Sequence, residues 1–221
     1  PYRETITRSA EGHHRHKKQT GGAGQFGEVF LRVEPLPRGT GFEFVNAVKG
    51  GTIPGVFIPA VEKGVRQVLE SGAVAGYPLQ DLRVVVTDGK THPVDSKEVA
   101  FVTAGRKAFL DAVANAGAIV LEPIVKLSIT APAATIGGIA GDLSSMRGRI
   151  NGETVLPGNS ALISAQVPLV ELGDYGHRLK AQTAGEGVYT MELSQYEPAP
   201  PRLQQELVGS YAKRRHEDDD A

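Results

Sequence analysis

The order of strand and helix patterns in the second half of the sequence constrains the fold more than any other feature. Apolar residues there alternate along some segments, as in half-buried strands, and recur at helical spacing along others. The expected elements are strand 124–130, helix 136–146, strands 149–155 and 161–167, helix 170–182 and strand 189–193. This β-α-β-β-α-β order is that of the ferredoxin-like split βαβ motif. We therefore predict a ferredoxin-like domain over residues 122–198.

Three strands are expected in the first half of the chain. Residues 28–34 alternate between apolar and charged side chains, and a second strand begins at Phe42. We expect these two strands to pair as a hairpin. The β-branched run 82–87 predicts a third strand, which Asp88-Gly89 closes as a turn.

A helix with a capping box is predicted after this third strand. Asp95 precedes Glu98 by three residues, the spacing of a capping box, and the helix is expected to run to about Ala116. Its apolar face would consist of Val99, Val102, Phe109 and Val113.

These patterns divide the chain into three expected parts. Residues 1–121 form an α/β domain that also contains a helix from Pro59 to Ser71. The ferredoxin-like domain follows, and residues 199–221 form a C-terminal helix with an acidic tail. This helix is expected over residues 202–214. The predicted fold class is therefore α/β (α+β) with two domains.

A basic run leads directly into a glycine-rich loop near the N-terminus. The run covers residues 13–18, and Gly21, Gly22 and Gly24 follow it before Gln25. Glycines permit positive φ and leave backbone N–H groups unshielded, so such a loop can lie against an anion. The preceding cations attract a polyanion over a longer range. We interpret this stretch as a loop suited to RNA phosphates, with a flexible, solvated hairpin loop as the alternative.

Two nucleotide-binding patterns overlap this loop, and neither has the context that its chemistry needs. Residues 22–27 satisfy G-x-G-x-x-G, but the dinucleotide motif must follow a strand and open a helix, whereas this one opens a strand. Residues 22–29 also fit the glycine loop of protein kinases, yet the H-R-D base and D-F-G metal ligand are missing. The P-loop pattern is absent as well.

No other catalytic or metal-binding set stands out. His92, Asp95 and Ser96 have the residue types of a hydrolytic triad, but the helix cap explains Asp95 better. The histidines between residues 13 and 16 have no cysteine or carboxylate at ligand spacing. We therefore expect no enzyme activity, no cofactor and no metal in this chain.

Composition limits the cellular location and the kinds of binding site that we expect for this chain. The formal net charge is −1, so any affinity for nucleic acid must come from local patches. There is no cysteine, hence no disulfide or thiolate site, and no apolar run approaches the length of a membrane span or signal peptide. We expect a cytoplasmic chain and, because position 1 is Pro, a fragment of a longer protein.

Ordered motifs along nearly the whole chain resemble bacterial elongation factor G. Those similar to its domain IV are residues 17–27, 41–44, 58–61, 75–78, 88–89 with 92, and 94–96. Those similar to its domain V are residues 121–124, 141–143 with 147–148, and 196–197. The resemblance implies a translational GTPase whose nucleotide-binding domain is absent from this chain. GTP and Mg²⁺ would then bind in that missing G domain.

The resemblance also implies a fold and a role for each part. The first domain would have a ribosomal protein S5-like fold with a left-handed βαβ crossover, contrary to the usual rule. It would act as an arm whose tip enters the decoding region and contacts tRNA and mRNA, promoting translocation mechanically. The second domain would lie against rRNA of the large subunit. The expected partners are the ribosome, tRNA and mRNA, with no membrane, and the chain is expected to be a monomer.

The expected RNA contacts combine two tip loops with basic residues. One family tip loop matches the glycine-rich stretch, and the other matches His92 with Asp95. Arg147 and Arg149 are expected as phosphate contacts, or else only complement a helix C-terminus. The predicted RNA-binding residues are Lys17, Lys18, Gly21, Gly22, Gly24, Gln25, Lys90, His92, Asp95, Arg147, Arg149 and Lys180.

Some positions depart from the family pattern. Ala23 and Met146 stand where the family has Arg, Glu186 replaces another Arg, and Pro93 replaces an Asp and stiffens its loop. Losing cations weakens phosphate binding across all sequences. An elongation-factor-G-like paralogue with a role in ribosome recycling or regulation is therefore an alternative to the main translocase. A free-standing RNA-binding module is a second alternative, because the fold type that the resemblance implies for the arm is shared with other RNA-binding proteins.

Overall fold

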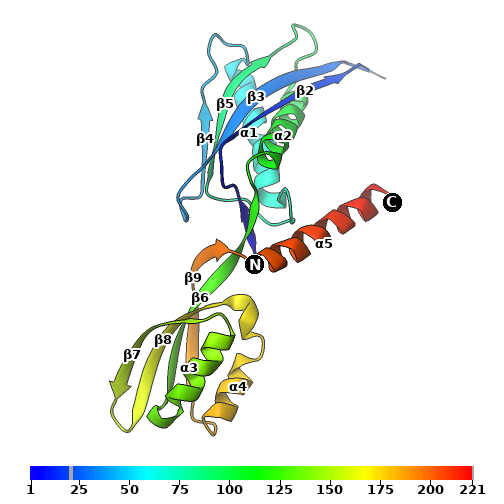
Figure 1. Ribbon diagram of the computed structural model, residues 1–221. Coiled ribbons are helices and arrows are strands. Elements are labelled where there is room, and N and C mark those ends of the chain that lie inside the picture. Colours follow the sequence, from blue (N-terminus) through cyan, green and yellow to red (C-terminus); the bar gives the residue numbers. More distant parts are fainter. Residues whose placement is uncertain (20–21, 221) are drawn as a thin grey trace. The chain divides into compact units, whose positions relative to one another are not determined.

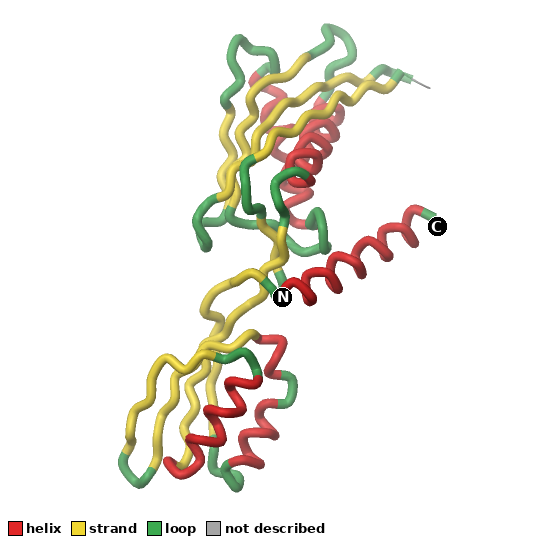
Figure 2. The backbone as a smooth tube through the Cα atoms, in the orientation of Figure 1, coloured by secondary structure: helices red, strands yellow, loops and turns green. Residues whose placement is uncertain are grey.

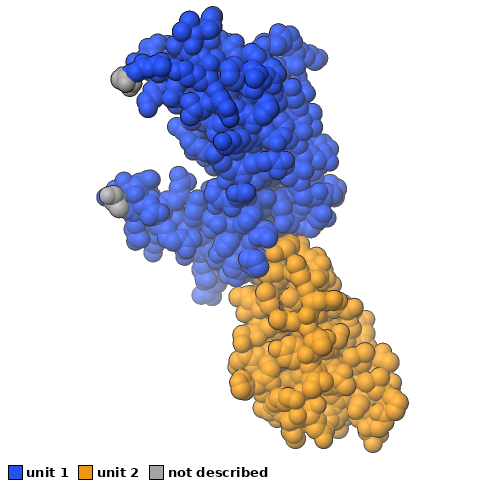
Figure 3. Space-filling model, turned by 180° about the vertical axis from the view of Figure 1, so that it is seen from behind, with its two compact units in different colours: residues 1–121, 198–221 blue, residues 122–197 orange. Residues whose placement is uncertain are grey.

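Contacts along the chain divide the computed structural model, which describes residues 1–19 and 22–220, into two units. Unit 1 comprises residues 1–121 and 198–221, and unit 2 comprises residues 122–197 (Figure 3). Each unit has a sheet with helices on one face (Figures 1 and 2). The C-terminal helix, which we predicted as a separate segment, therefore groups with the first unit.

The sheet of unit 1 has the strand order β2-β3-β5-β4. Its strands are β2 (Ala10–Lys18), β3 (Gln25–Pro35), β4 (Phe42–Asn46) and β5 (Leu82–Lys90). The basic run is thus itself a strand. β2 and β3 form an antiparallel hairpin around the glycine-rich loop, with Lys18 opposite Gln25.

The expected hairpin between the strands at 28–34 and 42–44 is wrong. β4 instead pairs with β5 in parallel, with Phe42 opposite Leu82. Asp81, just before β5, accepts hydrogen bonds from the backbone N–H groups of Gly39 (3.1 Å) and Gly41 (3.0 Å). These contacts place the start of β4 beside the start of β5. The helix α1 (Ile58–Ser71), confirmed as predicted, then joins the two parallel strands.

Asp88-Gly89 lies inside β5 and is not a turn. Gly89 pairs with Val29 of β3. A Cβ atom at Gly89 would lie 2.3 Å from the carbonyl oxygen of Glu28. Close approach of two backbones therefore requires glycine here, a role that the Asp-Gly pair does not reveal in the sequence.

The helix α2 (Glu98–Ala114) begins later than predicted. Lys97 occupies its N-cap and no side chain caps it, so the expected capping box at Asp95 does not form. Val99 is exposed, contrary to its expected place on the apolar face. The buried residues of the helix are Ala100, Phe101, Ala104, Gly105, Ala108, Phe109, Ala112 and Val113. Together with the apolar face of α1 they cover one side of the sheet and form the core of unit 1.

Two further elements complete unit 1. The short strand β1 (Arg3–Thr5) pairs with residues 119–121 at the start of β6 (Ile119–Pro132). The helix α5 (Pro201–Asp219) is confirmed near the C-terminus, but it extends through residues 217–219, which we expected in a tail. It buries no residue.

Unit 2 has the predicted β-α-β-β-α-β order, which confirms the ferredoxin-like arrangement. After β6 come α3 (Ile136–Ser145), β7 (Arg149–Leu156), β8 (Ser160–Pro168), α4 (Tyr175–Gln182) and β9 (Val188–Pro198). β6 pairs with β8 and β9, and β8 pairs with β7. The α4 helix is shorter than predicted, because residues 169–172 form a separate 3₁₀ turn.

The core of unit 2 contains one tyrosine with an unusual environment. The Tyr175 side chain is fully buried, and its hydroxyl has no hydrogen-bond partner among the described residues. Burial, and then the charge of Asp142, raises the pKa of this hydroxyl to about 12. The ring packs edge-on against Tyr189.

Replacing Tyr175 with phenylalanine is expected to raise the free energy of unfolding by about 1 kcal/mol, because a buried hydroxyl without a partner is costly. Urea unfolding followed by circular dichroism measures the difference. Tyr189→Phe serves as the matched control, since Tyr189 is only partly buried and its change is expected to be small. A loss of stability in Tyr175→Phe would instead show that the hydroxyl has a partner in solution.

Candidate nucleic-acid interface

Two loops meet at one end of the sheet of unit 1. The glycine loop (residues 19–24) joins β2 to β3, and the histidine loop (residues 91–97) joins β5 to α2. The Phe26 N–H donates to the carbonyl oxygen of Asp95 at 2.9 Å. In return, the Ser96 hydroxyl donates to the Phe26 carbonyl oxygen at 3.1 Å. The two loops, which the sequence analysis expected to share a tip, are therefore joined by hydrogen bonds.

Packing between the loops is tight at Gly24. A Cβ atom at this position would lie 2.7 Å from a carboxylate oxygen of Asp95. Any larger residue would require the Asp95 carboxylate to move. Gly22 is exposed, and none of the described residues lies within 4 Å of where its side chain would begin. Gly21, which we predicted as an RNA contact, lies outside the described residues.

His92 holds the histidine loop in shape. Its Nδ1 accepts hydrogen bonds from the backbone N–H groups of Val94 (3.2 Å) and Asp95 (3.1 Å). An acceptor at Nδ1 places the proton of the neutral imidazole on Nε2, which is therefore a donor. The side chain is 48% exposed. Pro93 fits this turn, because the hydrogen bonds come from the two residues after it.

Gln25 is the first residue of β3, directly after the glycine loop. Its side-chain oxygen lies 2.9 Å from Nε2 of His16, at the end of the β2–β3 hairpin. The carbonyl end of the amide is thus already used, which leaves the amide nitrogen as the end for an external acceptor. Both side chains are only partly buried.

Exposed cations surround this tip. Lys17 and Lys18 are exposed at the end of β2, and Lys90 is exposed at the end of β5, opposite Glu28. Burial, and then the charges of Lys107 and other nearby cations, lowers the pKa of His14 on β2. Lys107, on α2, therefore adds positive charge beside the basic strand. Sequence reasoning missed it, because only the packing of α2 on the sheet brings it there.

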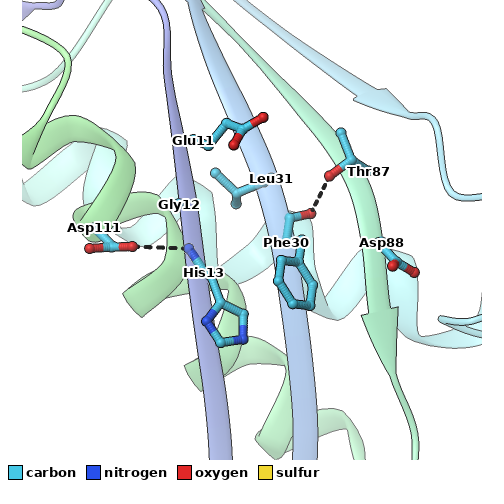
Figure 4. Close-up of a pocket in the computed structure, with 8 residues that line it drawn as sticks. All are labelled: Glu11, Gly12, His13, Phe30, Leu31, Thr87, Asp88 and Asp111. Carbon is cyan, nitrogen blue, oxygen red and sulfur yellow. Dashed lines mark hydrogen bonds between the residues drawn. The ribbon is translucent and has the colours of Figure 1, made fainter.

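A pocket of about 340 Å³ opens beside β2, β3, β5 and α2 (Figure 4). Three carboxylates line it, those of Glu11, Asp88 and Asp111. Asp111 accepts the backbone N–H of His13 at 3.0 Å. Hydrogen bonds from Gly89 and Thr52 lower the pKa of Asp88. Because negative charge repels phosphate, the lining of this pocket does not suit a phosphate group.

In unit 2, Arg147 is bound by carboxylates. It donates to both oxygens of Glu122, at 2.7 and 3.1 Å, and to Glu171 at 3.0 Å. These hydrogen bonds, led by those of Glu122, raise the pKa of the guanidinium. Glu122 is buried, so Arg147 neutralises an internal charge. The Arg147 side chain is still 37% exposed, so a phosphate would have to compete with Glu122 and Glu171 for it.

The other two predicted cations of unit 2 are more accessible. Arg149 is 63% exposed, although it contacts Gln166 (3.0 Å) and Glu197 (3.2 Å). Lys180 is exposed on α4, and its ammonium donates to the carbonyl oxygen of Gly185 at 3.1 Å. Both lie far along the sequence from the tip residues and belong to a different unit.

The described residues were also compared with the requirements of a metal site and of a membrane-spanning helix. Among residues 1–19 and 22–220, no group of three or more His, Cys, Asp and Glu side chains is placed to hold a metal ion. Within the same ranges, no helix has the length and apolar character needed to cross a membrane.

Two family models match the chain over adjacent segments. The model described as "Elongation factor G, domain IV" matches residues 1–117. The model described as "Elongation factor G C-terminus" matches residues 119–207. The chain belongs to the elongation factor G family.

Individual elongation factor G relatives agree with this assignment. An "Elongation factor G-like protein" of Thermotoga maritima is 43% identical over 94% of this chain, and "Elongation factor G" of Aquifex pyrophilus is 43% identical over 94% as well. A crystal structure of a Thermus thermophilus protein matches with a TM-score of 0.87 and 40% identity, covering 96% of this chain and 32% of that one. The chain spans 30% of the length of the two curated relatives.

The departures from the elongation factor G pattern fall in different surroundings. Ala23 lies exposed in the glycine loop and Glu186 lies exposed after α4, so each changes surface charge. Met146, in contrast, is buried in the core of unit 2, where its sulfur accepts a hydrogen bond from Arg178 at 3.2 Å.

Proposed function

We propose that this elongation factor G-type chain promotes tRNA–mRNA translocation mechanically, through the joined tip loops of unit 1. The proposed partners are tRNA and mRNA in the decoding region and rRNA of both subunits, in the cytoplasm, with the chain acting as a monomer. GTP and Mg²⁺ would bind in a G domain of the longer protein and supply the energy. In this proposal the chain acts by contacting RNA and by occupying space in the decoding region, and it catalyses no reaction itself.

The observation that carries the proposal is the hydrogen-bonded tip beside a basic strand. Asp95 and Ser96 bind the backbone of Phe26, at the start of β3, and these hydrogen bonds would couple the histidine loop to the sheet. If unit 1 moved as a body, the RNA in contact with its tip would then be displaced with it. His92 and Gln25 offer N–H donors, which suit the acceptor oxygens of RNA, and the exposed lysines supply attraction to phosphate.

For unit 2 we propose a smaller contact set than the sequence suggested. Arg149 and Lys180 are exposed and stay candidates for rRNA phosphates. Arg147 serves to neutralise Glu122 inside the unit and is left out of the proposed RNA-binding set.

The test is translocation on programmed ribosomes by the full-length parent protein, with GTP hydrolysis followed in the same reaction. Hydrolysis with rapid movement of tRNA and mRNA is the expected result. An absence of ribosome-dependent hydrolysis would contradict the ribosomal role itself.

A second candidate role is that of a paralogue acting in ribosome recycling or regulation. The observation in its favour is surface charge: Ala23 removes a cation from the tip, and Glu186 reverses one in unit 2, relative to the family pattern. Phosphate binding falls with the number of cations used. Ribosome-stimulated hydrolysis without movement would support this role over the main translocase.

A further inference from the structure

A carboxylate from the N-terminal strand is held inside unit 1 by backbone groups. Glu4, on β1, is fully buried. One of its oxygens accepts the N–H groups of Ala73 (2.8 Å) and Val74 (2.9 Å). The other accepts those of Ala75 (3.0 Å) and Tyr77 (2.9 Å). All four donors belong to the loop that follows α1.

This loop has the character of an anion-binding nest. Successive backbone N–H groups that converge on one point form a concave site for negative charge, and hydrogen bonds to a charged acceptor are stronger than neutral ones. We call residues 72–77 the carboxylate nest. At Gly72 the backbone φ is +82°, and a Cβ atom would lie 2.6 Å from the Glu4 carboxylate. Glycine at this position therefore makes the space that the carboxylate occupies.

The nest is held by contacts that do not involve the Glu4 side chain. The Gly72 N–H donates to the carbonyl oxygen of Val68 at 2.8 Å, and the Leu79 N–H donates to that of Leu69 at 2.8 Å. Both acceptors belong to α1. The backbone of Glu4 is fixed separately, by its N–H to the Pro78 oxygen at 2.8 Å. Removal of the side chain alone should therefore leave the nest formed and empty.

We propose that the carboxylate nest is a binding site for small carboxylates, with Glu4 as its built-in ligand. When the Glu4 side chain is absent, free acetate or formate takes its place on the same four N–H groups. The packing of β1 against the rest of unit 1 is then equivalent to ligand binding.

The helix α5 lies beside the same loop. Its Tyr211 ring is close to Gly76, where a Cβ atom would lie 3.0 Å from the ring.

Glu4→Ala in the complete chain provides the test. We expect its melting temperature, followed by circular dichroism, to fall by about 10 °C, because four charge-assisted hydrogen bonds are lost together. Sodium acetate or formate should then raise it saturably, whereas sodium chloride of equal ionic strength should not. At about ten times the dissociation constant, acetate should increase the folded-to-unfolded ratio about tenfold.

Two further measurements show where the added carboxylate binds and cover the case in which Glu4→Ala does not fold. In amide NMR spectra of Glu4→Ala, formate should shift the N–H signals of Ala73, Val74, Ala75 and Tyr77. Should this variant fail to fold in chloride, the measurement becomes refolding, expected in acetate and absent in chloride.

Controls separate a specific site from a general salt effect. Glu70→Ala, which removes an exposed carboxylate of α1, and the unaltered chain should show no difference between acetate and chloride. Glu4→Gln should show none either, because its amide fills the nest. Equal responses in Glu4→Ala and Glu70→Ala, or no rescue of Glu4→Ala by any carboxylate, would overturn the proposal.

Discussion

Replacing Arg147 with methionine is expected to lower the free energy of unfolding of unit 2 by about 3 kcal/mol, because a buried carboxylate loses its cation. The Glu122 side chain is only 3% exposed and depends on Arg147 for two hydrogen bonds. The estimate lies at the lower end of the range for buried pairs because the Arg147 side chain is 37% exposed. Urea unfolding followed by circular dichroism measures the change.

Two companion variants test the reason for this loss. In the double variant Arg147→Met with Glu122→Gln, the unpaired charge is gone, so we expect at least half of the lost stability to return. Arg149→Met is the matched control, since its partner Glu197 is 41% exposed, and its effect should stay below about 1 kcal/mol. Equal losses from Arg147→Met and Arg149→Met would show that Arg147 forms only an ordinary surface contact.

In the intact parent protein, replacing both Gln25 and His92 with alanine is expected to slow translocation about 100-fold, at roughly tenfold for each lost contact. Ribosome-stimulated GTP hydrolysis should not change, because neither residue belongs to the nucleotide-binding domain. Rapid-mixing measurements of mRNA movement and of phosphate release give the two rates. An unchanged translocation rate would contradict the assignment of the tip.

Single replacements of His92 distinguish the roles of the two imidazole nitrogens. Asparagine places an oxygen near the position of Nδ1 and so keeps the acceptor for the Val94 and Asp95 N–H groups. Glutamine places an N–H donor near the position of Nε2 but loses that acceptor. If Nε2 contacts RNA, His92→Gln should retain more translocation than His92→Asn. The reverse order would show that loop shape, and not the outward donor, is what matters.

Local patterns predicted the fold of unit 2 and the helix α1, because alternation and helical spacing depend on residues close in sequence. The partner of β4 could not be found in this way. Parallel pairing with β5 brings together residues 40 positions apart, as in Phe42 and Leu82. It also depends on Asp81 binding the loop at Gly39 and Gly41. Neither fact leaves a periodic signal in the sequence.

In the candidate site, too, residue types could be recognised from the sequence, but long-range contacts could not. The glycine loop and His92 were recognisable from their residue types, and the structure brings their loops together through Phe26. Arg147 had the residue type of a phosphate ligand, but its partner Glu122 is 25 positions away. Asp95 had the spacing of a helix cap, yet its backbone oxygen binds Phe26. In both cases the structure adds a long-range contact that the local sequence does not reveal.

The position of β2 has a consequence for how unit 1 behaves at high concentration. β2 is an edge strand, and such edges invite pairing with a strand of another molecule. Charged side chains, lysine above all, discourage that pairing, and Asp111 already covers the N–H of His13 on this edge. The basic residues of β2, for which we propose a role in attracting RNA, would therefore also keep one copy of the sheet from extending into the next. A chain neutralised along β2 is expected to gain a route to aggregation in addition to losing the proposed attraction to RNA.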